Sequence, residues 1–218
     1  MKRSWLVLVM AVCLVFGLRA LLLIDATALW SDELYSVGKS FQPSFGSLLA
    51  MLREDTHPPA YYGLLWVWGH LVGQSPVSLR LLSWLAYLAG GLVMVRQAMA
   101  LGHAGTRIRV AAVAALLAFC SPYPIRFAIE GKSYALLVLL LVLAWWWRRS
   151  VRPMAYGAVA GLTHFYGLFL VLAAAAWDGW RRRWSLSVAA LIGALPALAW
   201  MAYAANYLFS ARAGSWIG

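Results

Sequence analysis

Charged side chains are scarce in this sequence of 218 residues: only 11% are charged, whereas 64% are hydrophobic. A soluble domain usually carries about a quarter charged residues. The composition therefore excludes an ordinary soluble domain and predicts apolar surface that faces lipid. Cysteine is scarce too, and both Cys13 and Cys120 lie inside apolar runs. We interpret them as small buried hydrophobic side chains, with no disulfide or metal site implied.

Acidic residues are scarcer than basic ones: the sequence has 7 Asp and Glu and 18 Lys and Arg, which gives a formal net charge of +11. A strong positive charge is typical of proteins that bind nucleic acid. Here, however, the basic residues interrupt apolar runs and form no stripe on a polar face. We therefore predict no nucleic-acid partner and interpret the basic clusters as determinants of membrane topology.

Long apolar runs are what the sequence does contain. The first run follows Lys2 and Arg3 and resembles a signal peptide, with Ala26-Thr27-Ala28 as a cleavage site. Its length of about 20 residues is enough to span a bilayer, so we favour a retained first helix. Either interpretation places residue 30 outside the cytoplasm. The candidate segments are 5–24, 59–72, 77–99, 108–121, 133–147, 154–165, 167–179 and 186–207.

The basic clusters limit how many of these segments cross, because Lys and Arg favour the cytoplasmic side. All clusters share one side if segment 59–72 and its neighbour 44–53 lie in the outer interface. The segments 154–165 and 167–179 must then be two short helices that meet near His164. The clusters are Lys2/Arg3, Arg107/Arg109, Arg148/Arg149/Arg152 and Arg181/Arg182/Arg183.

The predicted fold is an all-α polytopic membrane protein with about seven transmembrane helices and one or two interfacial helices. We expect a single membrane domain over 1–218, located in the inner or plasma membrane, with a cytoplasmic N-terminus and a periplasmic or extracellular active face. Its outer loops are 25–78 and 121–132, followed by a turn at 163–167 and the tail from 208. Of the acids, only Asp178 lies inside on this topology, and Asp25, Asp32, Glu33, Glu54, Asp55 and Glu130 face outward. Loop acids hardly influence insertion, so this asymmetry requires a functional explanation.

The first candidate site is Trp30-Ser31-Asp32-Glu33, which follows the first apolar segment. Two adjacent carboxylates at a membrane exit lie where the dielectric falls, and one of them can be tuned as a base. The alternative is structural, with Ser31 or Asp32 capping an interfacial helix and Glu33 stabilising its N-terminus. Asp25, Glu54 and Asp55 are most simply solvated loop acids.

A second candidate is the run from Asp55 to Tyr62, Asp-Thr-His-Pro-Pro-Ala-Tyr-Tyr. The two prolines stiffen the turn and hold His57 at a defined place, and Tyr61 adds a hydroxyl donor. A Pro-Pro helix start with interfacial tyrosines is the structural alternative, and both stay open.

The second outer loop and a later helix break supply the remaining candidates. Arg126 and Lys132 suit a phosphate that emerges from a lipid, whereas a Glu130–Lys132 pair that closes a short loop is the structural alternative. His164 lies where two short helices meet, and there it either belongs to a site or bonds a carbonyl freed by the break.

These motifs, in this order, resemble the C-type membrane glycosyltransferases, most closely the protein mannosyltransferase and aminoarabinose transferase superfamily. The shared pattern is a first helix, Trp-x-Asp-Glu, Asp-x-His-Pro-Pro-x-Tyr-Tyr, a Ser-Pro-containing loop with a Glu, and Thr-His-x-Tyr-Gly. The run Ser-Leu-Arg-Leu-Leu-Ser at 78–83 also looks like that family. Many relatives have Gln-Glu-Ala-Arg where this chain has Ile-Glu-Gly-Lys at 129–132. Relatives also continue with further helices, which implies a fragment, a short version or half of a split enzyme.

The resemblance implies an inverting transfer of sugar from a polyprenyl-phosphate donor to a glycan, lipid or protein acceptor on the outer membrane face. By position, Asp32 is implied as the catalytic base, with Glu33 as its neighbour in the motif. Some relatives use a divalent cation such as Mg²⁺ or Mn²⁺, for which Asp32 and Glu130 are the candidate ligands, although nothing in the sequence requires one. Donor-phosphate or substrate binding is implied for His57, Tyr61, Arg126, Glu130, Lys132, Tyr134 and His164.

Two other functional classes stay open. One is a non-catalytic subunit that binds a lipid-linked sugar or assists assembly. The other is a transporter that uses the outer acids as a cation site, which is weakened because no acid lies in the middle of a predicted span.

Overall fold

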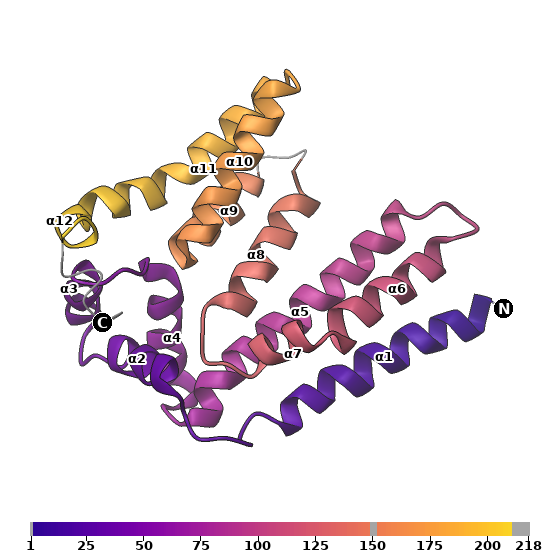
Figure 1. The fold of residues 1–218 in the computed structure, drawn as a ribbon, viewed down its shortest axis with the longest axis horizontal. Coiled ribbons are helices and arrows are strands. Elements are labelled where there is room, and N and C mark those ends of the chain that lie inside the picture. The colour runs from indigo at the N-terminus through magenta and orange to yellow at the C-terminus, as the bar shows by residue number, and fades with distance from the viewer. Residues whose placement is uncertain (1, 149–151, 211–218) are drawn as a thin grey trace. The chain divides into compact units, whose positions relative to one another are not determined.

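The computed structural model describes residues 2–148 and 152–210, and all regular elements in these ranges are helices (Figure 1). Their order is α1 (Lys2–Leu22), α2 (Ser31–Ser40), α3 (Phe45–Arg53), α4 (Pro59–Val72), α5 (Pro76–Leu101), α6 (Arg107–Cys120), α7 (Pro122–Ala128), α8 (Tyr134–Trp146), α9 (Arg152–Thr163), α10 (Phe165–Trp180), α11 (Trp184–Tyr203) and α12 (Ala205–Leu208). The all-α prediction is thus confirmed over the described part of the chain.

Three of the described helices are long and apolar enough to cross a membrane: α1 over Ser4–Leu22, α5 and α11. A fourth candidate is the pair α6 and α7, which bends by 54° at Ser121. A bilayer core about 30 Å thick requires about 20 helical residues. Three further apolar helices, α8, α9 and α10, fall in the range of 10 to 17 residues and are shorter than such a span. The seven predicted crossings are therefore not confirmed; the breaks near residues 121 and 164 shorten the helices.

The two segments predicted as interfacial helices are helical, as α3 and α4, and neither is among the helices able to cross. Ser44 caps α3, because its hydroxyl accepts from the Ser47 N–H while the Ser47 side chain accepts from the Ser44 N–H. Pro59 occupies the first turn of α4, where its missing N–H is not needed. The structural alternative for the Trp30–Glu33 motif was a helix capped by Ser31 or Asp32, and α2 begins at Ser31; the sequence interpretation gave no element of its own to α7 or α12.

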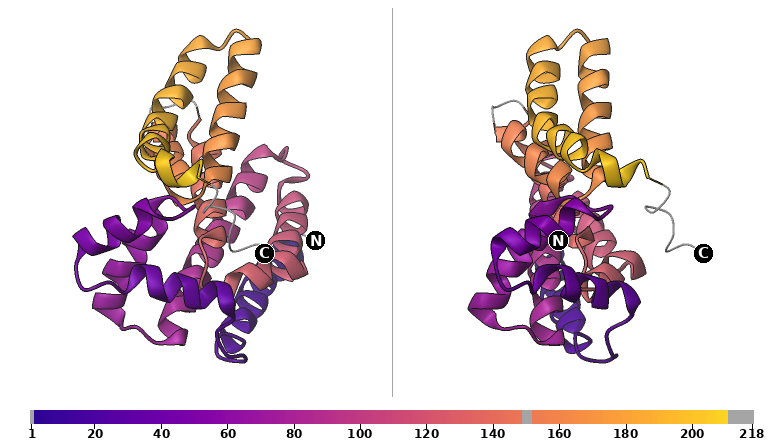
Figure 2. Two further views of the ribbon diagram at one scale, coloured as in Figure 1. Left: turned by 60° about the vertical axis from the view of Figure 1, so that its left-hand side comes forward. Right: turned by 90° about the vertical axis from the view of Figure 1, so that its left-hand side faces the viewer.

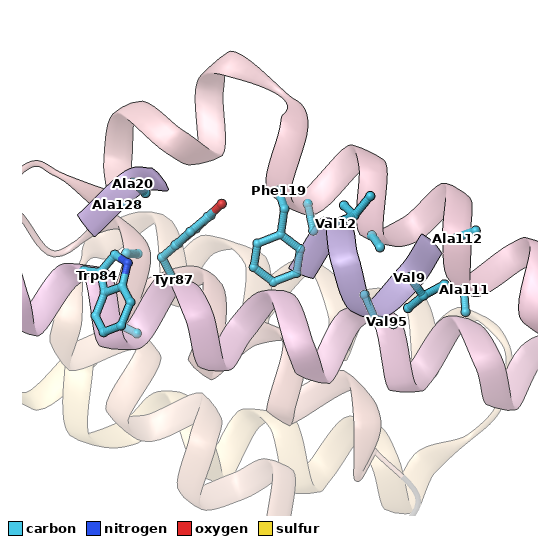
Figure 3. Packing of buried hydrophobic residues seen from close by; sticks show 14 of the residues in the cluster. Val9, Val12, Ala20, Trp84, Tyr87, Val95, Ala111, Ala112, Phe119 and Ala128 are labelled. Carbon is cyan, nitrogen blue, oxygen red and sulfur yellow. The ribbon is translucent and has the colours of Figure 1, made fainter. Parts of the chain in front are cut away.

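The chain divides into two compact units. Unit 1 comprises Met1–Glu33 and Ser75–Val142, and unit 2 comprises Leu34–Gln74 and Leu143–Gly218. In unit 1, α1, α5 and α6 pack around Val12, Trp84, Ala115 and Phe119 (Figure 3). The indole N–H of Trp84 donates to the Gly17 carbonyl at 2.9 Å, which joins α5 to α1 inside this core.

In unit 2, helices α9, α10 and α11 lie side by side (Figure 2). Gly193 lets α11 approach α9 closely, because a side chain there would meet the backbone of Met154. Asp178, the acid predicted to lie inside, is 4% exposed and accepts two hydrogen bonds from Arg148 Nη2, at 2.7 and 3.0 Å. The pair neutralises a carboxylate that would otherwise be costly to bury.

Candidate functional site

Glu33 is a completely buried carboxylate in unit 1, with 0% of its surface exposed. It lies in the first turn of α2 and meets Arg80 of α5 in a two-point ion pair. Arg80 Nε donates to Oε1 at 2.8 Å, and Nη2 donates to Oε2 at 2.7 Å. Parallel hydrogen bonds of this kind are the strongest arrangement of a guanidinium and a carboxylate.

The other N–H groups of Arg80 hold the chain that leads into α2. Nη1 donates to the carbonyls of Ile24 and Thr27, both at 2.8 Å, and Nη2 also donates to the Ala28 carbonyl at 3.1 Å. All five guanidinium donors are thus satisfied. The sequence interpretation used Arg80 only as part of the family-like run at 78–83 and assigned it no role. The sequence does contain an indication of its importance: Arg80 is a charged residue within an apolar segment of span length, and such a residue needs a partner.

The Glu33 carboxylate also reaches the second loop. Oε1 accepts from the Gly131 N–H at 2.7 Å, across 98 positions of sequence. Position 131 has no space for a side chain, because a Cβ would overlap the Leu79 side chain. Ser83 Oγ donates to the Lys132 carbonyl at 3.1 Å, so α5 holds this loop at a second point. Glu33 and Arg80 therefore fix both predicted outer-loop motifs of unit 1 in one place.

The environment of Glu33 favours its charged form. Burial alone would raise the pKa of this carboxyl. The hydrogen bonds from Arg80 and the Gly131 N–H, the positive charge of Arg80 and the Trp30 N–H together outweigh burial and hold the pKa below its ordinary value. Glu33 is therefore an ionised group whose hydrogen-bonding positions are occupied.

Asp32, the preceding residue, has the opposite environment. Its side chain is 41% exposed, and its Oδ2 lies 3.8 Å from the ammonium of Lys132, which is only 8% exposed. The two adjacent acids thus differ: Glu33 is enclosed, while Asp32 presents a partly exposed carboxylate beside a nearly buried cation. Asp32 and Glu33 differ in exposure because both lie on α2, which begins at Ser31, and successive side chains of a helix point to different sides.

The rest of the second loop adds a second cation. Arg126 Nε donates to Glu130 Oε1 at 2.9 Å; the Arg126 side chain is 65% exposed and that of Glu130 11%. The Tyr134 ring packs against Phe127 with centroids 5.0 Å apart. Six of the predicted site residues thus belong to unit 1: Asp32, Glu33, Arg126, Glu130, Lys132 and Tyr134.

Unit 2 holds the other predicted residues in a separate cluster. Asp55 Oδ2 lies 2.6 Å from Lys39 Nζ, and Asp55 Oδ1 lies 2.7 Å from His57 Nδ1. The interpretation of Asp55 as a solvated loop acid is wrong, because its side chain is 13% exposed and has two partners. Burial acts to raise its pKa, but the hydrogen bonds with His57 and Lys39 and their charges hold the pKa below the ordinary value.

The contact with Asp55 sets the state of the His57 ring. An ionised carboxylate only accepts hydrogen bonds, so Nδ1 of His57 carries the proton and donates a hydrogen bond to Asp55 Oδ1. In the neutral ring, Nε2 is then an acceptor. The His164 ring stands 6.2 Å from the His57 ring, nearly perpendicular to it.

His164 and Tyr61 have structural roles as well. His164 Nδ1 accepts from the Tyr166 N–H at 3.1 Å, so His164 caps α10. The structural alternative in the sequence analysis had His164 bonding a carbonyl freed by the helix break. In the structure, His164 instead accepts from an N–H at the start of α10. Tyr61 is fully buried, and its ring packs edge-on against Tyr62 at 5.3 Å.

The carboxylates do not form a metal site. No group of three or more His, Cys, Asp or Glu residues is close enough to hold a metal ion within 2–148 and 152–210. Asp32 and Glu130 each have a cationic neighbour, Lys132 and Arg126 respectively, which supplies the positive charge that a divalent ion would bring. The two residues present thus do not fit Mg²⁺ or Mn²⁺, and no step below involves a metal.

Comparison with known proteins gave no match. No protein-family model matches the chain, and neither a curated protein nor a solved structure is significantly similar to it. The functional assignment therefore depends on the residues of the two clusters and on the order of the sequence motifs.

Proposed function

We propose that this protein is an inverting glycosyltransferase that moves a sugar from a polyprenyl-phosphate donor to an acceptor on the outer face of the cytoplasmic membrane. One observation carries the proposal: the exposed carboxylate of Asp32 stands beside the ammonium of Lys132, on loops joined by the buried Glu33–Arg80 pair. A proton acceptor and a cation at one place are what this transfer requires.

The reaction assigns one task to each group. Asp32 accepts the proton from the acceptor hydroxyl, whose oxygen forms a bond to the anomeric carbon of the donor. The bond between that carbon and the phosphate oxygen breaks, and its electron pair leaves with the lipid phosphate. Attack from the side opposite the leaving group inverts the anomeric configuration. No charge is lost or created, since the proton moves to Asp32 and the negative charge to the phosphate.

The leaving phosphate gains negative charge, and fixed cations stabilise that charge. Lys132 is the first candidate because it is nearly buried, which strengthens its electrostatic interaction with a ligand. Arg126 is the second and is the more exposed of the two. Glu33 acts as a positioning residue in this scheme, because Arg80 and the Gly131 N–H occupy its carboxylate.

The cluster in unit 2 supplies substrate recognition in this proposal. The Asp55 carboxylate, itself paired with Lys39, favours the His57 tautomer with the proton on Nδ1. Its Nε2 then accepts a hydrogen bond from a hydroxyl group, which is the commonest donor on a sugar. In this proposal, His57 binds a hydroxyl group of a substrate. His164 and Tyr61 support this cluster through their ring contacts.

The membrane location of the active face belongs to the same proposal. Three or four span-length helices among the described residues fit a multi-pass protein. The basic clusters would place the N-terminus in the cytoplasm, and both acidic motifs on the opposite face. The acceptor is a glycan, a lipid or a protein that carries a hydroxyl group on that face.

Transfer from a radiolabelled polyprenyl-phosphate sugar in membranes tests the proposal. We expect Asp32→Asn to abolish transfer, because an amide does not accept the proton. Asp25→Asn is the matched control, since Asp25 is an exposed acid on the same connection between α1 and α2. Asp32→Asn membranes that transfer sugar at the wild-type rate would rule out the base assignment. A wild-type chain that binds the donor but transfers nothing would favour the non-catalytic subunit.

A further inference from the structure

The turn between α10 and α11 in unit 2 contains three consecutive arginines, Arg181, Arg182 and Arg183, which the proposed reaction does not use. The turn lies at one end of the paired helices α10 and α11 (Figure 2). Ser187 Oγ donates to the Ala175 carbonyl at 2.8 Å, so the start of α11 is fixed to α10. All three arginines are exposed. The turn thus presents a positively charged surface of defined position.

The backbone of this turn forms a Schellman motif, which ends many helices. The Arg183 N–H donates to the Asp178 carbonyl at 2.7 Å. The Arg182 N–H donates to the Gly179 carbonyl at 2.9 Å, and Arg182 takes the left-handed position of the motif, with a φ of 56°. Glycine is the usual residue at that position, because a Cβ is unfavourable in this conformation. The fold alone would therefore favour glycine, and the arginine indicates a role for the side chain.

The positive charge of the turn is largely unneutralised by the chain itself. Asp178, the acid of this helix pair, is 4% exposed and is bonded to Arg148. Arg183 Nη1 lies 3.6 Å from Asp178, whereas neither Arg181 nor Arg182 forms an ion pair with any residue in 2–148 or 152–210. Arg181 and Arg183 already place positive charge at the C-terminus of α10, so the helix dipole does not require a third arginine. Arg182 is thus available to an external anion.

Exposed tryptophans flank the turn on both helices. Trp177 and Trp180 lie in the last turn of α10 and Trp184 begins α11, and their exposed fractions are 58, 84 and 66%. The Arg181 guanidinium stands 5.8 Å from the centroid of the Trp177 ring. Helix α11, which begins at Trp184, is long and apolar enough to cross a membrane. Tryptophan at the end of a span is typical of the lipid headgroup region. A lipid phosphate is therefore the anion that best fits the surroundings of these arginines.

We propose that the α10–α11 turn is a binding site for anionic phospholipids, with the lipid phosphate on the guanidinium groups of Arg181 and Arg182. A guanidinium donates parallel hydrogen bonds to phosphate oxygens. An anionic headgroup adds net attraction, because it lacks the ammonium group that opposes arginine in a zwitterionic headgroup. Basic residues anywhere in this loop would satisfy the topology rule, so that rule does not explain arginine in the left-handed position. The site does not depend on the transferase reaction.

Lipid binding by the purified full chain in a neutral detergent, measured by native mass spectrometry, tests this site. The probes are dimyristoyl phosphatidylglycerol and dimyristoyl phosphatidylcholine, which share acyl chains and a phosphate and differ in headgroup charge. We expect the wild type to prefer phosphatidylglycerol. Arg182→Gly should leave the melting temperature unchanged or raise it, because glycine fits the left-handed position. The same variant should bind phosphatidylglycerol about fivefold more weakly, through loss of one charge near the lipid surface.

Further variants separate this site from a general effect of positive charge. Arg182→Lys keeps the charge and should lose less affinity than Arg182→Gly. The double variant Arg181→Gln with Arg182→Gly should bind phosphatidylglycerol at least about tenfold more weakly. Arg107→Gln with Arg109→Gln is the matched control, because it removes two exposed arginines from the start of α6, a helix without tryptophan. We expect the control to keep the wild-type lipid preference.

Each outcome decides for or against the site. A preference for phosphatidylglycerol that falls in Arg182→Gly and in the double variant, but not in the control, supports the proposal. Equal wild-type affinity for the two lipids overturns it, and so does an equal loss in the control, which would show general charge attraction. Displacement of the lipid by inorganic phosphate at equal concentration would identify a soluble anion as the ligand and would also overturn the lipid assignment.

Discussion

The guanidinium of Arg80 and the carboxylate of Glu33 meet in two parallel hydrogen bonds of 2.8 and 2.7 Å, across 47 positions of sequence. Both side chains are almost completely removed from solvent, at 3% and 0% exposure. A buried pair gains little over a well-packed apolar pair, but removal of one partner leaves an uncompensated charge. The pair therefore determines where the segment between α1 and α2 lies, and its contribution to stability is best measured by substituting one partner.

Glu33→Gln is expected to destabilise unit 1 strongly. Glutamine keeps the shape of the side chain but leaves the Arg80 charge buried and unpaired, at a cost of about 3–5 kcal/mol. Thermal unfolding in detergent measures the loss. The control Asp25→Asn changes an exposed carboxylate nearby and should stay within about 0.5 kcal/mol of the wild type. A small effect of Glu33→Gln would show that the pair does not hold the fold.

Acid should weaken the fold through Glu33 and Asp55. Both have pKa values held below the ordinary ones of 4.5 and 3.8, so the folded state favours their charged forms. Their contribution to stability is then complete above these ordinary values and is lost as the pH falls through the lowered values. The melting temperature should therefore fall below about pH 4.5, and Glu33→Gln should flatten this fall. An identical acid dependence in the variant would contradict the assignment.

Gly131→Ala is expected to displace the second loop from α5. The new Cβ would overlap Leu79, so the Gly131 N–H moves away from Glu33. We expect lower stability and loss of the proposed transfer activity. Gly38→Ala is the control, because position 38 on α2 has open space and alanine favours a helix by roughly 0.5–1 kcal/mol. The double variant Gly131→Ala with Leu79→Ala should recover part of the loss, and a fully tolerated Gly131→Ala would show that the close approach is not needed.

Asp55→Asn should change the protonation of the His57 ring. Without the anionic acceptor, the His57 tautomer with the proton on Nδ1 is no longer favoured over the tautomer with the proton on Nε2. Nitrogen NMR of a histidine-labelled sample distinguishes a protonated ring nitrogen from an unprotonated one, independently of activity. We expect the His57 signals to shift while those of His70, whose Nδ1 contacts the Trp66 carbonyl, stay in place. Glu54→Gln, a change in the exposed neighbouring acid, should leave both unchanged.

The sequence predicted helices well where apolar length and turn residues coincide. The segment 59–72 matches α4 at both ends, because Pro58 and Pro59 open it and Gly73 follows it. The polar helix α2 lacks an apolar run, so its presence was not signalled in the same way. The seven crossings are not confirmed, because hydropathy measures apolar length, whereas the bend at Ser121 depends on local backbone geometry. The break near His164, between α9 and α10, was predicted from the sequence.

The candidate site was predictable by residue type but not by partner. Asp32 and Glu33 are equivalent in the sequence, and only the position of Arg80 decides which one is enclosed. Periodicity places a residue on a helix, but it contains no information on contacts 47 or 98 positions away. The same holds for Asp55, which lies between α3 and α4 and whose partner Lys39 lies on α2.

The long separations within the Glu33 contacts also set an order of assembly during synthesis. Residue 33 leaves the ribosome well before Arg80 and before Gly131, which lie 47 and 98 positions later. At about 5–20 residues per second, the carboxylate waits roughly 2–9 s for its guanidinium and 5–20 s for its last N–H donor. The segment between α1 and α2 therefore reaches its final conformation only after α7 has been made, and a nascent chain halted before residue 80 carries a Glu33 carboxylate that still lacks its guanidinium partner.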